Sequence, residues 1–104
     1  MALIFTPVME DEYLDFLHAR EHVAGNQLVR VDCDTQCNVL LTSDSEFQNY
    51  KNGRSFYYGG GFFKEFPAFL PAPHPGFWNI TIDLGGGRAQ INYSITIVTM
   101  PDRM

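Results

Sequence analysis

The chain has 104 residues, of which 45% are apolar, enough for one domain with a single hydrophobic core. Its 12 acidic residues outnumber 7 Lys and Arg, and the net charge of -5 without a basic cluster argues against nucleic acid as a partner. There is no run of about 20 apolar residues to cross a membrane, and the acidic start MALIFTPVMEDEY does not match a signal peptide, so we expect a cytoplasmic protein without a membrane partner.

Residues 1–13 are predicted to be an extension, because a short apolar piece is followed by Pro7 and the acidic run EDE. An arm, an added strand and a partly disordered segment all fit this composition. Residues 14–98 are predicted to form the single domain, and residues 99–104 a tail. At its start, residues 14–18 fit a short strand or one helical turn, and Gly25-Asn26 indicates a turn.

A hairpin and a helix are predicted next. Residues 27–33 (QLVRVDC) alternate β-branched and polar side chains, and residues 37–42 (CNVLLT) run back as a second strand. Ser43 lies three residues before Glu46, which is the spacing of a capping box. These signals predict a helix over residues 44–51 that stops at Asn52-Gly53.

The second half of the domain is predicted to be β-rich. Residues 55–58 fit a short strand ending at the three glycines 59–61, and Pro71, Pro73 and Pro75 predict an extended, poorly pairing link over residues 70–76. Residues 77–84 (FWNITIDL) predict a strand, which places Trp78, Ile80 and Ile82 on one face and Asn79, Thr81 and Asp83 on the other.

A glycine turn and a long strand close the domain. Gly85-Gly86-Gly87 predicts a hairpin loop, and residues 88–98 alternate as a strand with Ile95 and Ile97 facing inward. Short strands separated by Gly and Pro turns predict a mostly β fold: a small antiparallel β-sandwich or open barrel with one short helix.

The segment 43–61 (SDSEFQNYKNGRSFYYGGG) combines aromatic, amide, guanidinium and glycine residues, which suits a recognition surface. Its aromatics also fit a plain core, and the two interpretations are compatible because neighbouring residues of a strand face opposite ways. If this segment is a binding site, the guanidinium of Arg54 binds an anionic group of the ligand, a tyrosine stacks on a ring, and the glycine backbone lines the site. The candidate ligand-binding residues are Asn49, Tyr50, Arg54, Tyr57, Tyr58, Gly59, Gly60, His74 and Trp78.

The cysteines and histidines give no strong chemical motif. Cys33 and Cys37 flank the predicted turn, where a disulfide is geometrically allowed but cytosolic conditions favour free thiols. The spacing of these cysteines and of His18 and His22 resembles that of zinc ligands only loosely, so no metal is expected. A structural domain stabilised by zinc stays an alternative. No nucleophile–base pair has supporting neighbours, and we expect neither catalysis nor a cofactor.

Several blocks of the sequence occur together in a known family. They are FLH at residues 16–18, NVLL followed by SDSEFQNYKNGRSFYYGGG, a Pro-rich link, GFWNITIDLGG and a closing alternating strand. Over residues 14–98 the chain resembles the bacterial DUF1883 family, a small domain of unknown function. The resemblance lends no catalytic residues. It implies an association with TIR domains, and hence antiviral signalling by nucleotide-derived messengers in bacterial or phage immunity.

The sequence therefore predicts a non-catalytic binding module for a small polar or anionic ligand. The resemblance suggests a nucleotide-derived ligand. The domain would act as a sponge that sequesters this ligand if the chain acts alone, or as a sensor if a partner supplies the effector. The alternative is a protein-interaction or homo-oligomerisation module that uses the aromatic and glycine residues of FYYGGGFFKEF as its interface.

Overall fold

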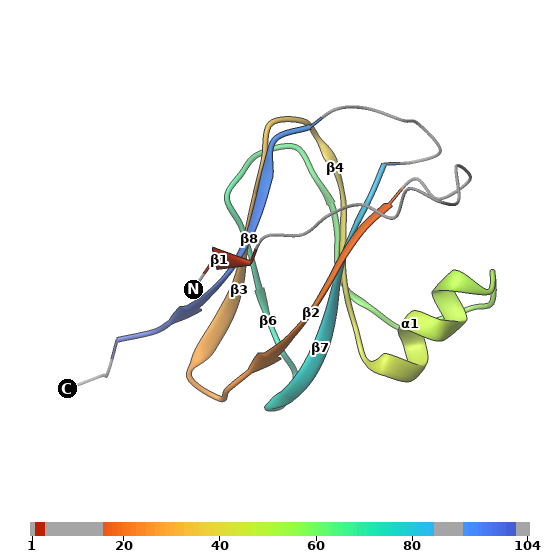
Figure 1. Ribbon diagram of the computed structural model, residues 1–104, viewed down its shortest axis with the longest axis horizontal. Helices are drawn as coiled ribbons and strands as arrows, with labels where there is room; N and C mark the ends of the chain where they lie inside the picture. The colour runs from red at the N-terminus through yellow and green to blue at the C-terminus, as the bar shows by residue number, and fades with distance from the viewer. Residues whose placement is uncertain (1, 4–15, 85–90, 102–104) are drawn as a thin grey trace.

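The computed structural model describes residues 2–3, 16–84 and 91–101. In this part of the chain, two four-stranded antiparallel sheets face each other and a helix lies against the outer side of the second sheet (Figure 1). The elements are β1 (Ala2–Leu3), β2 (Phe16–Val23), β3 (Gln27–Cys33), β4 (Cys37–Thr42), α1 (Asp44–Lys51), β5 (Gly59–Phe63), β6 (Ala68–Pro71), β7 (Gly76–Asp83) and β8 (Tyr93–Thr99).

The strand order is β1-β8-β3-β6 in the first sheet and β2-β7-β4-β5 in the second. Among the described residues no strand is shared between the sheets, so the fold is the predicted β-sandwich rather than a closed barrel. β1 is an added strand from the predicted extension, with Leu3 opposite Ile95 of β8. The described part of the chain contains no helix that is long and apolar enough to cross a membrane.

The core fills the space between the two sheets. Its most enclosed side chains come from the alternating strands that the sequence predicts, and Val29, Val31, Val39, Ile80, Ile82 and Ile95 are each 0% exposed. Trp78, the single tryptophan of the chain, is 6% exposed in the same core. The predicted core faces of β3, β7 and β8 are therefore confirmed for these residues.

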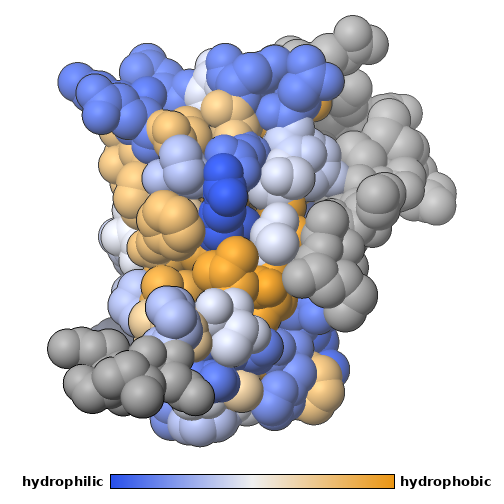
Figure 2. Space-filling view, turned by 90° about the vertical axis from the view of Figure 1, so that its left-hand side faces the viewer, coloured by the Kyte–Doolittle hydropathy of each residue, from blue (hydrophilic) through white to orange (hydrophobic). Residues whose placement is uncertain are grey.

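The outer faces of the two sheets differ. The outer face of the first sheet is exposed to solvent: Arg30 Nε lies 3.0 Å from Asp32 Oδ2, and Phe69, opposite Arg30 on β6, is half exposed. Figure 2 views this side of the molecule and shows apolar surface interrupted by hydrophilic residues. The outer face of the second sheet is covered by α1, which is why Asn79 and Thr81 on β7 are buried although they are polar.

Helix α1 begins and ends where the sequence predicts. The Ser43 hydroxyl accepts a hydrogen bond from the Glu46 backbone N–H at 3.3 Å, as expected for an N-cap. Phe47 is the buried residue of the helix. The helix therefore contacts the sheet through a narrow apolar face, and most of its other side chains remain accessible to solvent.

Several predictions about the strands differ from the structure. β3 and β4 do not form the predicted hairpin, because they lie in different sheets. The predicted link begins with a paired strand, since Leu70 and Pro71 belong to β6, which pairs with β3. Residues 55–58 are not a strand; the strand starts at Gly59, and the glycines that were expected to end it form β5. At Gly60 the backbone has φ +96°, and a Cβ there would lie 2.1 Å from the Val39 carbonyl oxygen, so glycine permits the close pairing of β5 with β4. β2 continues through His22 to Val23, and β8 extends to Thr99, while the predicted loop 85–87 and residues 88–90 lie outside the described residues.

A candidate ligand-binding groove

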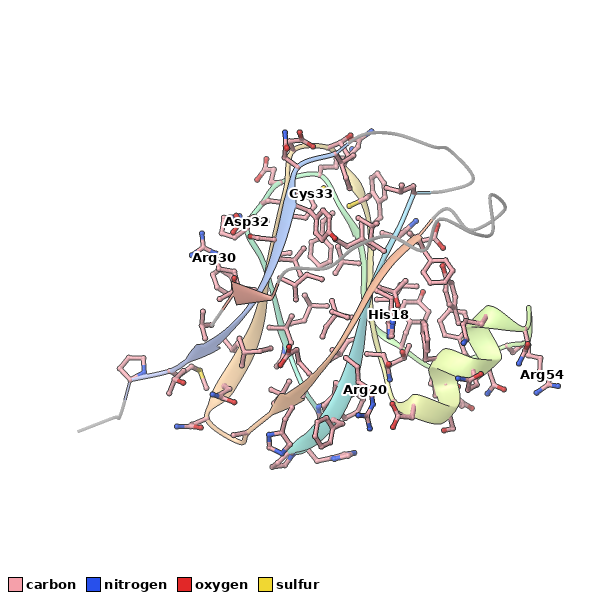
Figure 3. The ribbon with its side chains drawn as sticks, viewed as in Figure 1. His18, Arg20, Arg30, Asp32, Cys33 and Arg54 are labelled. Atoms are coloured by element: carbon pink, nitrogen blue, oxygen red, sulfur yellow. The ribbon has the colours of Figure 1, made fainter. Side chains whose placement is uncertain are left out.

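A groove of about 770 Å³ lies between α1 and the outer face of strands β2 and β7. The strands supply its base, and the helix supplies one wall along its whole length (Figure 3). Its lining residues are Phe16, His18, Arg20, Asp44, Ser45, Phe47, Gln48, Lys51 and Asn79. None of these was among the candidate ligand-binding residues predicted from the sequence, although Asp44, Ser45, Phe47, Gln48 and Lys51 belong to the predicted segment 43–61.

A chain of hydrogen bonds runs along the groove from β2 to α1 and back through β7. Arg20 donates twice to Asp44, from Nε to Oδ1 and from Nη2 to Oδ2, each at 2.9 Å. Asn79 Nδ2 donates to Asp44 Oδ1 at 2.7 Å, and Asn79 Oδ1 lies 2.7 Å from His18 Nε2. Since an ionised carboxylate only accepts, Asn79 Nδ2 faces Asp44, and the Asn79 oxygen accepts a hydrogen bond from His18 Nε2–H.

This chain of bonds shifts the pKa of two of its members. Hydrogen bonds from Arg20, and then from Asn79, lower the pKa of Asp44 to about 2. Burial lowers the pKa of His18 from 6.5, against the opposing effect of its bond to Asn79. At neutral pH the groove therefore holds an ionised carboxylate and a neutral imidazole.

Aromatic rings form the apolar part of the groove. The His18 ring stacks on Phe47 with centroids 4.0 Å apart and 9° between the planes. Phe16 meets Phe47 edge-on at 6.2 Å. Offset and edge-on ring contacts of this kind hold their side chains in place beyond what burial alone contributes.

Two cationic side chains on the groove have hydrogen-bonding capacity left. Lys51 Nζ lies 5.1 Å from the centre of the Phe47 ring, and no carboxylate among the described residues pairs with it. Arg20 uses Nε and Nη2 on Asp44 and packs its guanidinium 4.3 Å from the Phe77 ring centre, and its Nη1 has no hydrogen bond within the described part of the chain. An anionic group in the groove would meet donors from two elements.

Two of the residues predicted from the sequence, Asn49 and Tyr50, support the structure of the helix and its flank. Asn49 Nδ2 lies 3.4 Å from Glu46 Oε1, and the Asn49 carbonyl accepts from the Arg54 N–H at 2.9 Å, which closes the turn after the helix. The Tyr50 hydroxyl donates to Asp83 Oδ2 at 2.6 Å and ties α1 to β7. The ring of Tyr50 contacts Phe56 edge-on at 5.3 Å.

The predicted Arg54 and Tyr57 lie beyond the helix, away from the groove. Figure 3 shows Arg54 projecting from the turn on the side of α1 that faces away from the sheets. Tyr57 is 84% exposed, and its backbone N–H donates to Glu46 Oε1 at 2.9 Å. Tyr58 is 54% exposed and packs on Phe56. These exposed rings form a surface of their own next to β5.

The remaining predicted residues lie in two other places. Gly59 and Gly60 pair with Leu41 and Leu40 in the edge strand β5. Trp78 is in the core, and its Nε1 donates to the His74 carbonyl at 2.9 Å, while the His74 ring lies 5.0 Å from the indole. The structure therefore does not bring the predicted residues into one pocket.

The residues that do meet in the groove had a weak signal in the sequence. Asn79 stands on the polar face of the predicted strand 77–84, and Asp44 follows the predicted N-cap. Both observations show that these side chains leave the core, but neither shows that the helix folds back over that face. In the described part of the chain, no group of three His, Cys, Asp or Glu side chains is placed to hold a metal ion.

A family model described as a domain of unknown function, DUF1883, matches residues 14–101. The chain belongs to the DUF1883 family. The match covers both sheets apart from β1, together with α1 and the groove, so these features lie within the DUF1883 domain. No curated protein and no solved structure shows a significant match.

Proposed function

We propose that this DUF1883 domain is a non-catalytic binding module whose groove between α1, β2 and β7 holds a small anionic ligand with a flat ring. The observation that carries the proposal is the placement of Lys51 and Arg20, two cations with unused donors, beside the aromatic side chains of Phe16 and Phe47. Cations bind the charged part of such a ligand, and the rings pack against its flat part.

The groove suits this role because its base is already held in place. Asn79 is 2% exposed and fixed by bonds to His18, Asp44 and the Thr42 carbonyl, the last at 3.4 Å. A site ordered before the ligand arrives loses less conformational entropy on binding. The volume of about 770 Å³ also lies in the range of about 300–1,000 Å³ that is common for small-molecule sites.

A nucleotide combines the two parts that the groove would recognise, a flat base and a phosphate. The resemblance on which we expected a nucleotide-derived messenger points to the same class. Adenosine monophosphate is therefore the smallest suitable probe. The domain would sequester its ligand if the chain acts alone, and would sense it if a partner supplies the effector.

The test compares single substitutions of two cationic residues, one inside the groove and one outside it. Lys51→Gln removes a charged donor from the groove and should weaken adenosine monophosphate binding about tenfold or more, since a hydrogen bond to a charged group contributes about 1.5–3 kcal/mol. Arg54→Gln removes the same charge outside the groove and should leave the dissociation constant unchanged. Titration calorimetry measures both, and native mass spectrometry of freshly purified protein looks for a retained ligand.

The opposite ranking would overturn the proposed groove. If Arg54→Gln abolishes binding and Lys51→Gln does not, the ligand is held at the turn after α1, where the predicted Arg54 lies, and not in the groove. If adenosine monophosphate does not bind and the purified protein carries no small molecule, the proposal is wrong for nucleotide ligands.

The second candidate function is an interaction or oligomerisation module, and the exposure of three neighbouring aromatics favours it. Tyr57, Tyr58 and Phe62 are 84%, 54% and 54% exposed. Exposed aromatic side chains next to an edge strand are typical of protein-binding surfaces. Native mass spectrometry of wild type and Tyr57→Ser tests it, since an oligomer that dissociates in the variant would support this function.

A further inference from the structure

Two cysteines lie in contact where the polypeptide passes from one sheet to the other. Cys33 is the last residue of β3 in the first sheet, and Cys37 is the first residue of β4 in the second. Their sulfur atoms are 3.9 Å apart, and both are free thiols. The turn between them is held by the Asp34 N–H, which donates to the Asn92 carbonyl at 3.1 Å.

The two thiols differ in access to solvent. Cys37 is 4% exposed and packs in the core, whereas Cys33 is half-buried. Cys33 lines a hollow of about 410 Å³ together with Asp34, Thr35, Gln36, Lys64 and Phe66. A small polar reagent that enters this hollow reaches the sulfur of Cys33 before that of Cys37.

We propose that Cys33 and Cys37 are a redox-active pair that hydrogen peroxide or a small organic hydroperoxide oxidises to an intramolecular disulfide. A disulfide requires the sulfurs to approach from 3.9 Å to about 2.05 Å, and the half-buried Cys33 is the less enclosed of the two side chains. The pair is separate from the groove of the proposed function, and the inference does not depend on that function.

The oxidation balances in two steps. In the first, the Cys33 thiolate attacks one peroxide oxygen, the O–O bond breaks, and the other oxygen leaves as water or an alcohol after taking up a proton. Cys33 is then a sulfenic acid. In the second, the Cys37 sulfur attacks the Cys33 sulfur, the S–O bond breaks, and hydroxide leaves as water with the proton that Cys37 releases. A dithiol reductant reverses the change by thiol–disulfide exchange.

The environment of Cys37 argues against its reacting first with the peroxide. Burial, and after it the neighbouring Cys33, raises the pKa of Cys37 to about 12, so Cys37 stays protonated while Cys33 is reduced. Conversion of Cys33 to an uncharged sulfenic acid removes one of these causes. The order of reaction, Cys33 first and Cys37 second, follows from both access and charge.

The experiment measures the intact mass of the protein after hydrogen peroxide treatment, with and without a dithiol reductant. Wild type should lose the mass of two hydrogens per chain, at a rate independent of protein concentration, and regain it on reduction. In Cys37→Ala the sulfenic acid on Cys33 has no partner, and dimedone should trap it as an adduct. In Cys33→Ser, Cys37 should give no adduct under the same conditions.

Three results would overturn the proposal. They are oxygen addition to wild type without loss of two hydrogens, a disulfide that joins two chains, and dimedone labelling of Cys37 in Cys33→Ser. Circular dichroism of each variant before treatment shows whether it is folded. If Cys37→Ala is unfolded, the labelling of Cys33→Ser and the wild-type mass change decide the question by themselves.

Discussion

The imidazole of His18 lies flat on the ring of Phe47, with centroids 4.0 Å apart and the planes 9° apart. His18 belongs to β2 and Phe47 to α1, so this contact joins the helix to the sheet across the base of the groove. The same histidine donates to Asn79 from its Nε2. Helix docking and groove geometry therefore depend on the same few side chains, and changes to them have measurable consequences.

Stability should fall when the pH drops through the range in which His18 titrates. Burial lowers the pKa of His18 from 6.5, so below that pH the unfolded chain binds more protons than the folded one. The free energy of unfolding is therefore highest above pH 6.5 and decreases as the pH falls through the lowered pKa. Urea unfolding followed by the fluorescence of Trp78 at several pH values measures this slope.

Two histidine variants assign the slope to one residue. His18→Phe should unfold at lower urea concentration but lose the pH dependence between neutral pH and the range where carboxylates titrate. His22→Gln, an exposed histidine on the same strand, should keep it. An unchanged slope in His18→Phe would show that another group is responsible. Asp44 acts in a separate, more acidic range, because its stabilising effect is lost as the pH falls from 3.8 toward about 2.

Removing the buried amide of Asn79 should cost the domain much more stability than removing an exposed amide. Asn79→Ala leaves buried polar groups of His18 and the Thr42 carbonyl without this partner, which should lower the free energy of unfolding by about 2–3 kcal/mol. Asn92→Ala removes an exposed bond to Asp34 and should cost about 1 kcal/mol or less. Equal losses in urea unfolding would contradict a special role for Asn79.

The alternating strands and the helix are predictable from the sequence because their signals are local. β3, β4 and α1 occupy the predicted residues, and β7 has the predicted core face with Ile80 and Ile82. Strand β5 is not predictable in this way. Three consecutive glycines indicate a turn by propensity, and only the tertiary pairing with β4 makes them a strand.

The groove is less predictable than the fold because it forms between elements. His18 and Asn79 are 61 residues apart, and no spacing rule connects them. Sequence reasoning selected instead a run in which aromatic, amide and Arg residues are close along the chain. The structure distributes that run over a helix, an exposed turn and an edge strand, so α1 supplies one wall of the groove while Arg54, Tyr57 and Tyr58 lie outside it.

Tyr50 and Tyr57 should respond differently to loss of the hydroxyl group. The Tyr50 hydroxyl donates to Asp83 at 2.6 Å, so Tyr50→Phe should lower the free energy of unfolding by about 1–2 kcal/mol. Tyr57 is 84% exposed, and Tyr57→Phe should leave stability unchanged. Thermal unfolding of the two variants checks the difference. A stable Tyr50→Phe would mean that the bond to Asp83 does not help to hold the helix.

The glycines of β5 should tolerate a methyl group at one position and not at the next. At Gly60, φ is +96°, and a Cβ would lie 2.1 Å from the Val39 oxygen and 2.8 Å from Leu70 Cδ2. The first contact is with backbone and is not relieved by a change of rotamer. Gly60→Ala should therefore lower the free energy of unfolding by at least about 2 kcal/mol, from backbone strain and loss of β4–β5 pairing together.

Gly59 is the matched control for this substitution, because its added Cβ would meet only Leu41 Cβ at an ordinary 3.8 Å. Gly59→Ala should change stability by less than about 1 kcal/mol. The two alanine variants have the same composition, so urea unfolding compares position alone. Equal stability of the two variants would show that β5 does not pair with β4 at Gly60 as described. The exposed aromatic side chains beside this strand would then also lie in different positions.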